Sequence, residues 1–381
     1  MKRLYVRLFL ILFILFSSAA NPQGKTEEDN RNGKALLAFT GDLMCHSPQF
    51  EYAKTDSGYD FTPYYEYIRS ELSYADLTIG NLETVLSGRE MKFSGYPDFN
   101  SPDEYALALK EAGFDFLVTA NNHSLDRGEK GLLRTLDVLK GQGIGSTGTY
   151  SSQTDRDSLR ILKINGIFFA LLNYTYGTNG KPVPKGKDYL INLIDKKLIQ
   201  KDILKAKELK ADIIIVLYHY GQEYKREPDN YQKQVNDWAR EAGADVIIGS
   251  HPHVLQPAVF LADSSGLTRK FTAYSLGNFF SNQQWRYSDA GAVLYLSFEK
   301  NAERATLTTA DFLPTWVFKG DIDGKRTYRI LPSTASGCEH QYGFLSKSQR
   351  AAFRRSYEDS REILTRFDRK IGVFPMRNCS H

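Results

Sequence analysis

Side chains that can bind metal ions or move protons recur in this chain directly after short apolar segments. Four of the seven histidines are among them, together with carboxylates and carboxamides. Taken singly, each has an ordinary explanation as a loop or capping residue, and Gly-Asp and Gly-Asn pairs are common in turns. Their recurrence after five segments favours a shared site. The residues are Asp42, Asn81, Glu83, Asn122, His123, His219, His251 and His253.

The ligand types in this set are chemically coherent. A mixture of carboxylate, imidazole and amide oxygen suits borderline divalent ions such as Zn²⁺, Mn²⁺ or Fe²⁺, whereas cages made only of oxygen suit Ca²⁺ or Mg²⁺. If the segment His251-Pro252-His253 is extended, both rings lie on one face, because side-chain direction repeats every two residues in a strand. Two adjacent metal ions could then share this short segment.

The apolar segments are predicted to be strands of an α/β fold. Ligands of α/β sheets gather in the crevice at the carboxyl ends of the strands, which is where these polar residues would lie. Asn165-Gly166 between two apolar runs indicates a hairpin. Strands are predicted at 35–39, 76–79, 114–119, 213–217 and 245–248, and helices at 102–112, after 128, at 195–210 and at 231–242.

The pattern changes after residue 255. Short strands follow one another there without a long helix until the C-terminal region, where a helix is predicted over 346–370. No repeat of fixed period is present. The short strands are predicted at 256–261, 271–275, 291–298 and 305–312.

Composition excludes several classes of protein. The chain has 381 residues, with 41% hydrophobic and 13% aromatic residues, which is typical of a folded globular protein and excludes disorder for most of its length. The formal net charge is +4, from 49 Lys and Arg against 45 Asp and Glu. Three of the positive residues lie within the first seven, so the remainder is nearly neutral. Bulk charge therefore gives no reason to expect a nucleic acid as partner.

The N-terminus has the features of an export signal. Three basic residues precede the unbroken apolar run Leu8–Phe16, and small residues follow it up to Ala20. Residues 1–20 are predicted to be a signal peptide cleaved after Ala20, and the polar residues 21–34 a linker. The apolar run is short for a membrane span, which needs roughly 20 residues; a permanent anchor is the alternative. We expect the protein in the periplasm or at the cell surface, with membrane association left open.

Three cysteines bear on this prediction. An exported protein meets an oxidising compartment, in which disulfides form. Cys338 and Cys379 lie together in the C-terminal region, whereas Cys45 is far from both. The prediction is a Cys338–Cys379 disulfide and one free thiol; two reduced thiols are the alternative.

Six short motifs together resemble those of the capsule synthesis protein CapA family, which is associated with poly-γ-glutamate production. The resemblance covers about 36–300, and that family is in turn similar to the calcineurin-like metallophosphoesterases. It implies a four-layer α/β/β/α sandwich over 35–300 with a dinuclear metal site, and a C-terminal part, 301–381, that completes the domain or packs on it. The motifs are residues 39–44, 80–83, 121–126, 219–224, 249–256 and 275–279.

The resemblance also implies roles for single residues. Asp42 and His253 would bind the first metal ion, and Glu83 would bridge both ions. The second ion would be held by Asn122, His219 and His251.

His123 falls where the phosphoesterases keep a histidine that acts on the leaving group or the phosphate oxygens. Asp126 would orient its ring, and Asn81 and Asn278 are predicted to bind substrate, a turn role for Asn278 being equally consistent with Gly277 before it. Three departures concern catalysis. Met44 stands where the phosphoesterases have an imidazole ligand, with His46 close enough in sequence to replace it. Glu83 stands where they usually have aspartate, and Ser124 stands where an acidic residue follows the histidine.

These residues are consistent with two candidate functions. In the first, the protein assists synthesis, assembly or export of an anionic capsule polymer such as poly-γ-glutamate, together with membrane-bound synthesis partners. In the second, it is a metal-dependent hydrolase that acts on a phosphoester or a γ-glutamyl amide, with His123 as the proton donor. Met44 favours binding or a single metal ion, and His123 favours chemistry.

Overall fold

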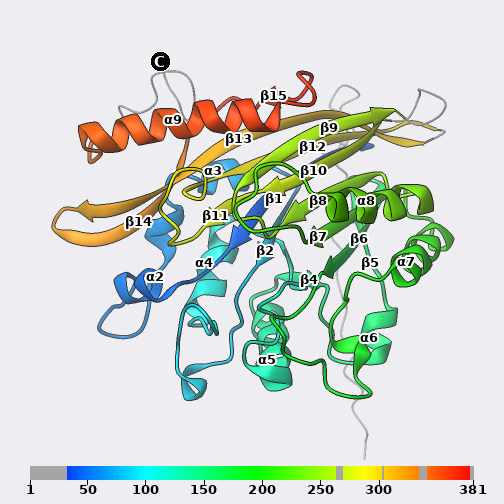
Figure 1. Cartoon of the computed structure of the whole chain (residues 1–381), viewed down its shortest axis with the longest axis horizontal. Helices are drawn as coiled ribbons and strands as arrows, with labels where there is room; N and C mark the ends of the chain where they lie inside the picture. The colour runs from blue at the N-terminus through cyan, green and yellow to red at the C-terminus, as the bar shows by residue number, and fades with distance from the viewer. Residues whose placement is uncertain (1–31, 263–268, 303, 334–340, 378–381) are drawn as a thin grey trace, which may run out of the picture. The chain divides into compact units, whose positions relative to one another are not determined.

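Two β-sheets packed against each other carry the residues singled out above (Figure 1). The computed structural model describes residues 32–262, 269–302, 304–333 and 341–377. The predicted signal peptide and nearly all of the predicted linker lie outside these residues, and so do Cys338 and Cys379. The cleavage site and the disulfide therefore stay predictions, and Cys45 is buried with a free thiol.

The first sheet has nine strands among the described residues, in the order β14-β13-β12-β1-β2-β3-β4, with β11 paired to β1 and β15 to β13. The strands from β1 to β4 are parallel, and β12 to β14 are antiparallel. Their bounds are β1 Lys34–Leu43, β2 Leu77–Leu82, β3 Phe116–Val118, β4 Gly145–Thr147, β11 Asn278–Phe280, β12 Ala290–Lys300, β13 Ala305–Ile322, β14 Lys325–Pro332 and β15 Gly372–Val373.

The second sheet has six strands in the described part of the chain, in the order β5-β6-β7-β8-β10-β9. The predicted hairpin at Asn165-Gly166 is confirmed: both residues have positive φ, and Ile164 pairs with Ile167 across the turn. The bounds are β5 Arg160–Ile164, β6 Ile167–Thr175, β7 Ile213–His219, β8 Val246–Ser250, β9 Leu255–Ala262 and β10 Arg269–Leu276.

One apolar core lies between the two sheets. Phe39 of β1 and Phe116 of β3 face this core from the first sheet, and Ile215 of β7 and Val246 of β8 face it from the second. Successive residues of a strand point to opposite faces, and both faces of these strands are buried. This is why the strands read as continuous apolar runs in the sequence.

Helices cover the outer faces of both sheets. Helices α4 (Glu104–Ala112) and α5 (Gly128–Gly141) pack on the first sheet, and α7 (Lys196–Glu208) and α8 (Asn230–Ala242) pack on the second. The order helix, sheet, sheet, helix confirms the predicted α/β/β/α sandwich. Helix α9 (Lys347–Leu364) packs on β9 and β13 and is seen along the top of Figure 1.

Short helices occur in the connections. They are α2 (Ser47–Tyr52), α3 (Arg69–Leu72) and α6 (Gln153–Asp157), with 3₁₀ turns at Thr62–Tyr65, Arg89–Met91 and Asp188–Leu190. In the ranges that the structure describes, no helix combines the length and the apolar character needed to cross a membrane.

The C-terminal elements differ from the sequence prediction. The strand predicted at 305–312 extends to Ile322, and β14 after it was not predicted. Pro314 argues against a strand by itself, but tertiary pairing with Ala292 keeps the backbone extended. The turn Asp323-Gly324 has positive φ at both residues and joins β13 to β14, a hairpin signal that the sequence did carry. The predicted helix 346–370 ends at Leu364, because the chain then turns to pair β15 with β13.

A close approach of two backbones fixes the end of β1. The backbone N–H of Asp42 donates to the carbonyl oxygen of Gly277, at 2.9 Å. A Cβ atom on Gly41 would lie 1.9 Å from the same oxygen, so only glycine allows the two segments to meet. The position of the Asp42 side chain therefore depends on having glycine, which lacks a Cβ atom, at position 41.

We expect Gly41→Ala to lower the free energy of unfolding by roughly 1–3 kcal/mol, because the methyl group forces these backbones apart. Gly141→Ala in α5 is the control, since a Cβ atom there meets nothing within 4 Å; it should be neutral or stabilise by up to about 1 kcal/mol. Urea unfolding followed by circular dichroism measures both. Equal stability of the two variants would contradict the conclusion that only glycine fits at position 41.

Candidate metal centre

The predicted ligands come together where strands of both sheets end. Asp42 lies near the end of β1 and pairs with Asn81 of β2, with Glu83 directly after that strand. His219 is the last residue of β7, and His251 directly follows β8. All are buried. The carboxyl ends of two sheets therefore meet at one polar cluster, as the strand pattern predicted.

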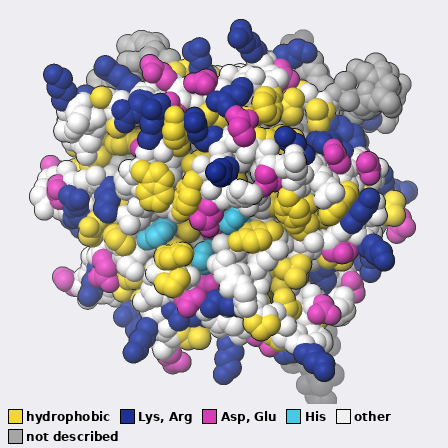
Figure 2. Space-filling view, viewed as in Figure 1, with side chains coloured by type: hydrophobic (Ala, Val, Ile, Leu, Met, Phe, Trp, Pro, Cys, Tyr) yellow, Lys and Arg dark blue, Asp and Glu magenta, His cyan; other side chains and the backbone are white. Residues whose placement is uncertain are grey.

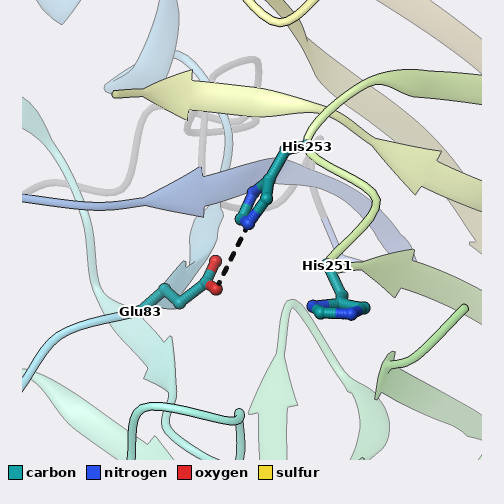
Figure 3. Close-up of side chains that lie close together, drawn as sticks. All are labelled: Glu83, His251 and His253. Atoms are coloured by element: carbon teal, nitrogen blue, oxygen red, sulfur yellow. Dashed lines mark ion pairs between the residues drawn. The ribbon is translucent and has the colours of Figure 1, made fainter. Parts of the chain in front are cut away.

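Glu83 lies at the middle of this cluster. Its Oε1 atom is 3.5 Å from Nε2 of His219 and 3.7 Å from Nε2 of His253. His253 in turn has Nδ1 3.0 Å from Oδ2 of Asp42. Figure 3 shows the side chains of Glu83, His251 and His253, with the ion pair between Glu83 and His253 drawn as a dashed line.

Two groups of described residues place three ligand atoms within 4.8 Å of one another: Glu83 with His251 and His253, and Asp42 with Glu83 and His219. Glu83 belongs to both groups, which fits the bridging position predicted for it. Oδ1 of Asn122 lies 2.8 Å from Nε2 of His219, so these two atoms face the same space. The division of the remaining ligands between two ions stays a prediction.

The bonding state of these atoms suits a cation. Both carboxylate oxygens of Glu83 and Nδ1 of His251 are buried and accept no hydrogen bond from any described residue. Burial, and then the charge of Asp42, raise the pKa of Glu83 well above its usual range. Burial lowers the pKa of His219 well below its usual range and that of His251 to about 3, so both rings are neutral, which is the form that binds a metal ion. Divalent ions of the Zn²⁺, Mn²⁺ or Fe²⁺ type fit this donor set.

The His251-Pro252-His253 segment is not extended, which corrects the geometry expected from sequence. His251 has φ 100° and His253 has φ 57°, both in the left-handed region that side chains other than glycine rarely adopt. The two rings converge because of this backbone shape, and strand alternation is not the cause. Such conformations cost of order 1–3 kcal/mol each and are found mostly at functional sites.

His123 and Asp126 form a buried pair beside the ligands. Nδ1 of His123 lies 2.7 Å from Oδ2 of Asp126, and the same oxygen accepts the backbone N–H of Phe99 at 2.7 Å. The Phe99 ring packs edge-on against His123, with centroids 4.7 Å apart. Asp126 is thus placed to hold the ring of His123, as predicted; a part in catalysis stays a prediction.

Asn81 and Asn278 are both buried and bonded to predicted ligands. Asn81 Nδ2 donates to Asp42 at 2.8 Å and lies 3.2 Å from Nδ1 of His219. Asn278 Oδ1 lies 3.1 Å from Nδ1 of His253. The two amides orient ligand side chains in this structure, and their role in substrate binding stays a prediction.

Met44 and His46 do not add a ligand. Met44 is buried, and its sulfur accepts a hydrogen bond from Ser281 Oγ at 3.7 Å. His46 is the N-cap residue of α2 and has Nδ1 3.1 Å from the side chain of Gln49, and burial lowers its pKa to about 4. His46 belongs to neither ligand group among the described residues, so it does not supply the imidazole ligand that the resemblance implies at position 44.

Aromatic residues at the mouth of the centre were not predicted. Tyr176 packs on His251 with ring centroids 4.6 Å apart, and Tyr224 lies 6.1 Å from His253 and 5.4 Å from the exposed Trp285. Figure 2 shows histidine side chains in the middle of one face, with hydrophobic side chains beside them. Tyr176 directly follows an apolar strand, the same signal that identified the ligands, but tyrosine was not among the residue types considered.

Comparison with known proteins gives a consistent result. The profile of a family described as bacterial capsule synthesis protein PGA_cap matches residues 36–283, which include every candidate ligand. The PGA biosynthesis protein CapA of Bacillus subtilis is 28% identical over 87% of this chain and 87% of its own, and the capsule biosynthesis protein CapA of Bacillus anthracis is 28% identical over 87% and 82%. Among solved structures, the chain is similar to the calcineurin-like phosphoesterase YfkN of Bacillus subtilis, with a TM-score of 0.42 and 14% identity over 85% of this chain and 99% of that one.

Glu83→Gln should stabilise the metal-free protein and abolish metal binding. The substitution replaces a carboxyl group that burial and Asp42 make costly to ionise by a neutral amide that can donate to Asp42, which we expect to raise the free energy of unfolding by about 1 kcal/mol or more. Thermal unfolding in chelator and in Zn²⁺, together with elemental analysis, measures both effects. The exposed Glu51→Gln is the control. A Glu83→Gln protein that loads as much metal as the wild type would show that Glu83 is not a ligand.

Proposed function

The chain belongs to the bacterial capsule synthesis protein family PGA_cap, and from this membership we propose that it acts in the synthesis, assembly or export of an anionic capsule polymer such as poly-γ-glutamate. The observation that carries the proposal is the extent of the family match, because residues 36–283 enclose the whole polar cluster at the strand ends. Two relatives that cover most of the chain are named for PGA and capsule biosynthesis. A role outside the cell further requires export, which we propose from the sequence of residues 1–20.

The metal centre is part of this proposal. Asp42, Glu83, Asn122, His219, His251 and His253 would hold one or two divalent ions. A bound ion would polarise an oxygen of a phosphate, carboxylate or amide group. The protein supplies fixed ligands, since both sheets hold them from strand ends, and a buried setting in which charge interactions are strong.

The partners follow from the same chemistry. A site with cationic metal favours an anionic group, so we propose an anionic polymer or a phosphorylated substrate as ligand. Membrane-bound synthesis proteins are the proposed protein partners, and nucleic acid is not among the proposed partners because the mature chain is nearly neutral.

A second candidate function is hydrolysis, and one observation favours it. His123 and Asp126 form a buried pair at 2.7 Å next to the ligands, in the arrangement of a histidine held by a carboxylate. With Asp126 on Nδ1, the Nε2 atom of His123 is the one left to give a proton to a leaving group. The substrate would be a phosphoester or a γ-glutamyl amide.

Deletion of the gene in its native host tests the main proposal. We expect loss or shortening of the surface polymer, measured by isolating it and determining its amount and length. Wild-type protein should restore the polymer, and Glu83→Gln should not, although it folds. A normal polymer in the deletion strain would overturn the proposal.

His123→Ala separates the two candidate functions. It should leave metal content unchanged, because His123 belongs to neither ligand group, and lower any hydrolysis about 10²–10⁴-fold, the usual contribution of a general acid. His46→Asn is the matched control, since asparagine can also start α2. If metal-loaded wild-type protein hydrolyses neither phosphodiester nor γ-glutamyl amide test substrates, the hydrolase candidate is wrong.

A further inference from the structure

Tyr176 is fixed at the metal centre by the sheet itself. It directly follows β6, in which Thr175 pairs with His219 of β7. The backbone N–H of Tyr176 donates to the carbonyl oxygen of His219 at 3.0 Å. The last strand pairing therefore places Tyr176 beside the histidine that ends the neighbouring strand.

The side chain of Tyr176 contacts all three residues predicted to hold the second metal ion. Its ring lies 4.6 Å from that of His251 and is nearly parallel to that of His219, with centroids 6.3 Å apart and planes at 10°. Burial raises the pKa of its hydroxyl, and the neighbouring side chain of Asn122 lowers it. A single side chain thus covers His219, His251 and Asn122 from one side.

Tyr176 also forms the boundary with solvent. Its side chain is 41% exposed, whereas the three residues that it covers are at most 3% exposed. The chain after it is held in place, because Asn179 accepts a hydrogen bond from Nδ2 of Asn122 at 3.2 Å and Lys181 pairs with Asp98 at 2.7 Å. A group that enters the centre on this side meets the phenol in a fixed position.

Packing on the histidines requires only the ring, which phenylalanine would supply. The hydroxyl adds a donor at the edge of the ligand cluster, since the ring packs on His251 and a phenol keeps its proton at neutral pH. We propose that the hydroxyl of Tyr176 donates a hydrogen bond to an oxygen of the anionic group, phosphate or carboxylate, that binds at this centre. The inference rests on the proposed function, in which the centre binds such a group.

The test measures anion binding and does not depend on turnover. Full-length mature protein is loaded with Zn²⁺ and titrated with inorganic phosphate and, separately, with acetate by calorimetry, and metal content is measured in parallel. Tyr176→Phe should keep the metal content of the wild type and bind the preferred anion about ten- to a hundredfold more weakly, as expected for loss of one hydrogen bond to a charged group. Tyr231→Phe, a tyrosine of equal exposure at the start of α8, should bind as the wild type does.

The outcomes separate the inference from the proposed function. Unchanged affinity of Tyr176→Phe for both anions overturns the inference alone. Loss of metal from Tyr176→Phe also overturns it, since the residue would then act by positioning Asn122. If wild-type protein loads metal but binds neither anion, the proposed function of the centre fails, and the inference fails with it. The anion that loses affinity identifies which of the two groups Tyr176 contacts.

Discussion

The carboxylate of Glu83 is buried between Asp42 and three imidazoles, and the rest of the site depends on how that charge is held. Neither of its oxygens accepts a hydrogen bond from the described residues. An unpaired carboxylate in the interior is costly, and the neighbouring charge of Asp42 makes it more so. A divalent cation between these groups would attract both carboxylates and so offset their repulsion and the cost of their burial. The apolar core must supply enough stability to keep the site assembled until a cation binds.

The two-sheet architecture meets this requirement by fixing each ligand through backbone contacts. Asp42 is held by its pairing with Asn81 and by the hydrogen bond to Gly277. His251 and His253 have left-handed backbone conformations, and the carbonyl oxygen of Pro252 between them accepts the backbone N–H of Tyr224 at 2.7 Å. Because the core between the sheets is shared, strand ends from distant parts of the sequence cannot move apart independently. The packing of this large interior thus offsets the free-energy cost of the strained backbone at the site.

Local sequence patterns predicted much of this arrangement and failed where tertiary structure decides. Apolar runs followed by Asp42, Glu83 or His219 identified the strands and their polar ends, because both features are encoded within a few residues. The shape of the His251–His253 segment was wrong, since positive φ at a histidine is imposed by its neighbours in space and has no local signal. Tyr176 was missed for a different reason: it follows an apolar strand as the ligands do, but tyrosine was not among the residue types considered. The extension of β13 past Pro314 likewise rests on pairing, with β12 up to Trp316 and with β14 up to Ile322.

Met44 and His123 bear on different parts of the same chemistry, and this resolves their apparent conflict. Met44 stands where the resemblance implies an imidazole ligand of the first metal ion, and His46 belongs to neither ligand group of the described residues, so this change would affect how many ions bind and how tightly. His123 and Asp126 are the pair proposed to transfer a proton, and among the described residues they belong to neither ligand group. A buried histidine–carboxylate pair is costly to keep, and an apolar pair of similar size would fill the same space. A centre with one firmly held ion and a working proton donor is consistent with both residues, whereas a purely structural site explains Met44 and leaves His123 without a role.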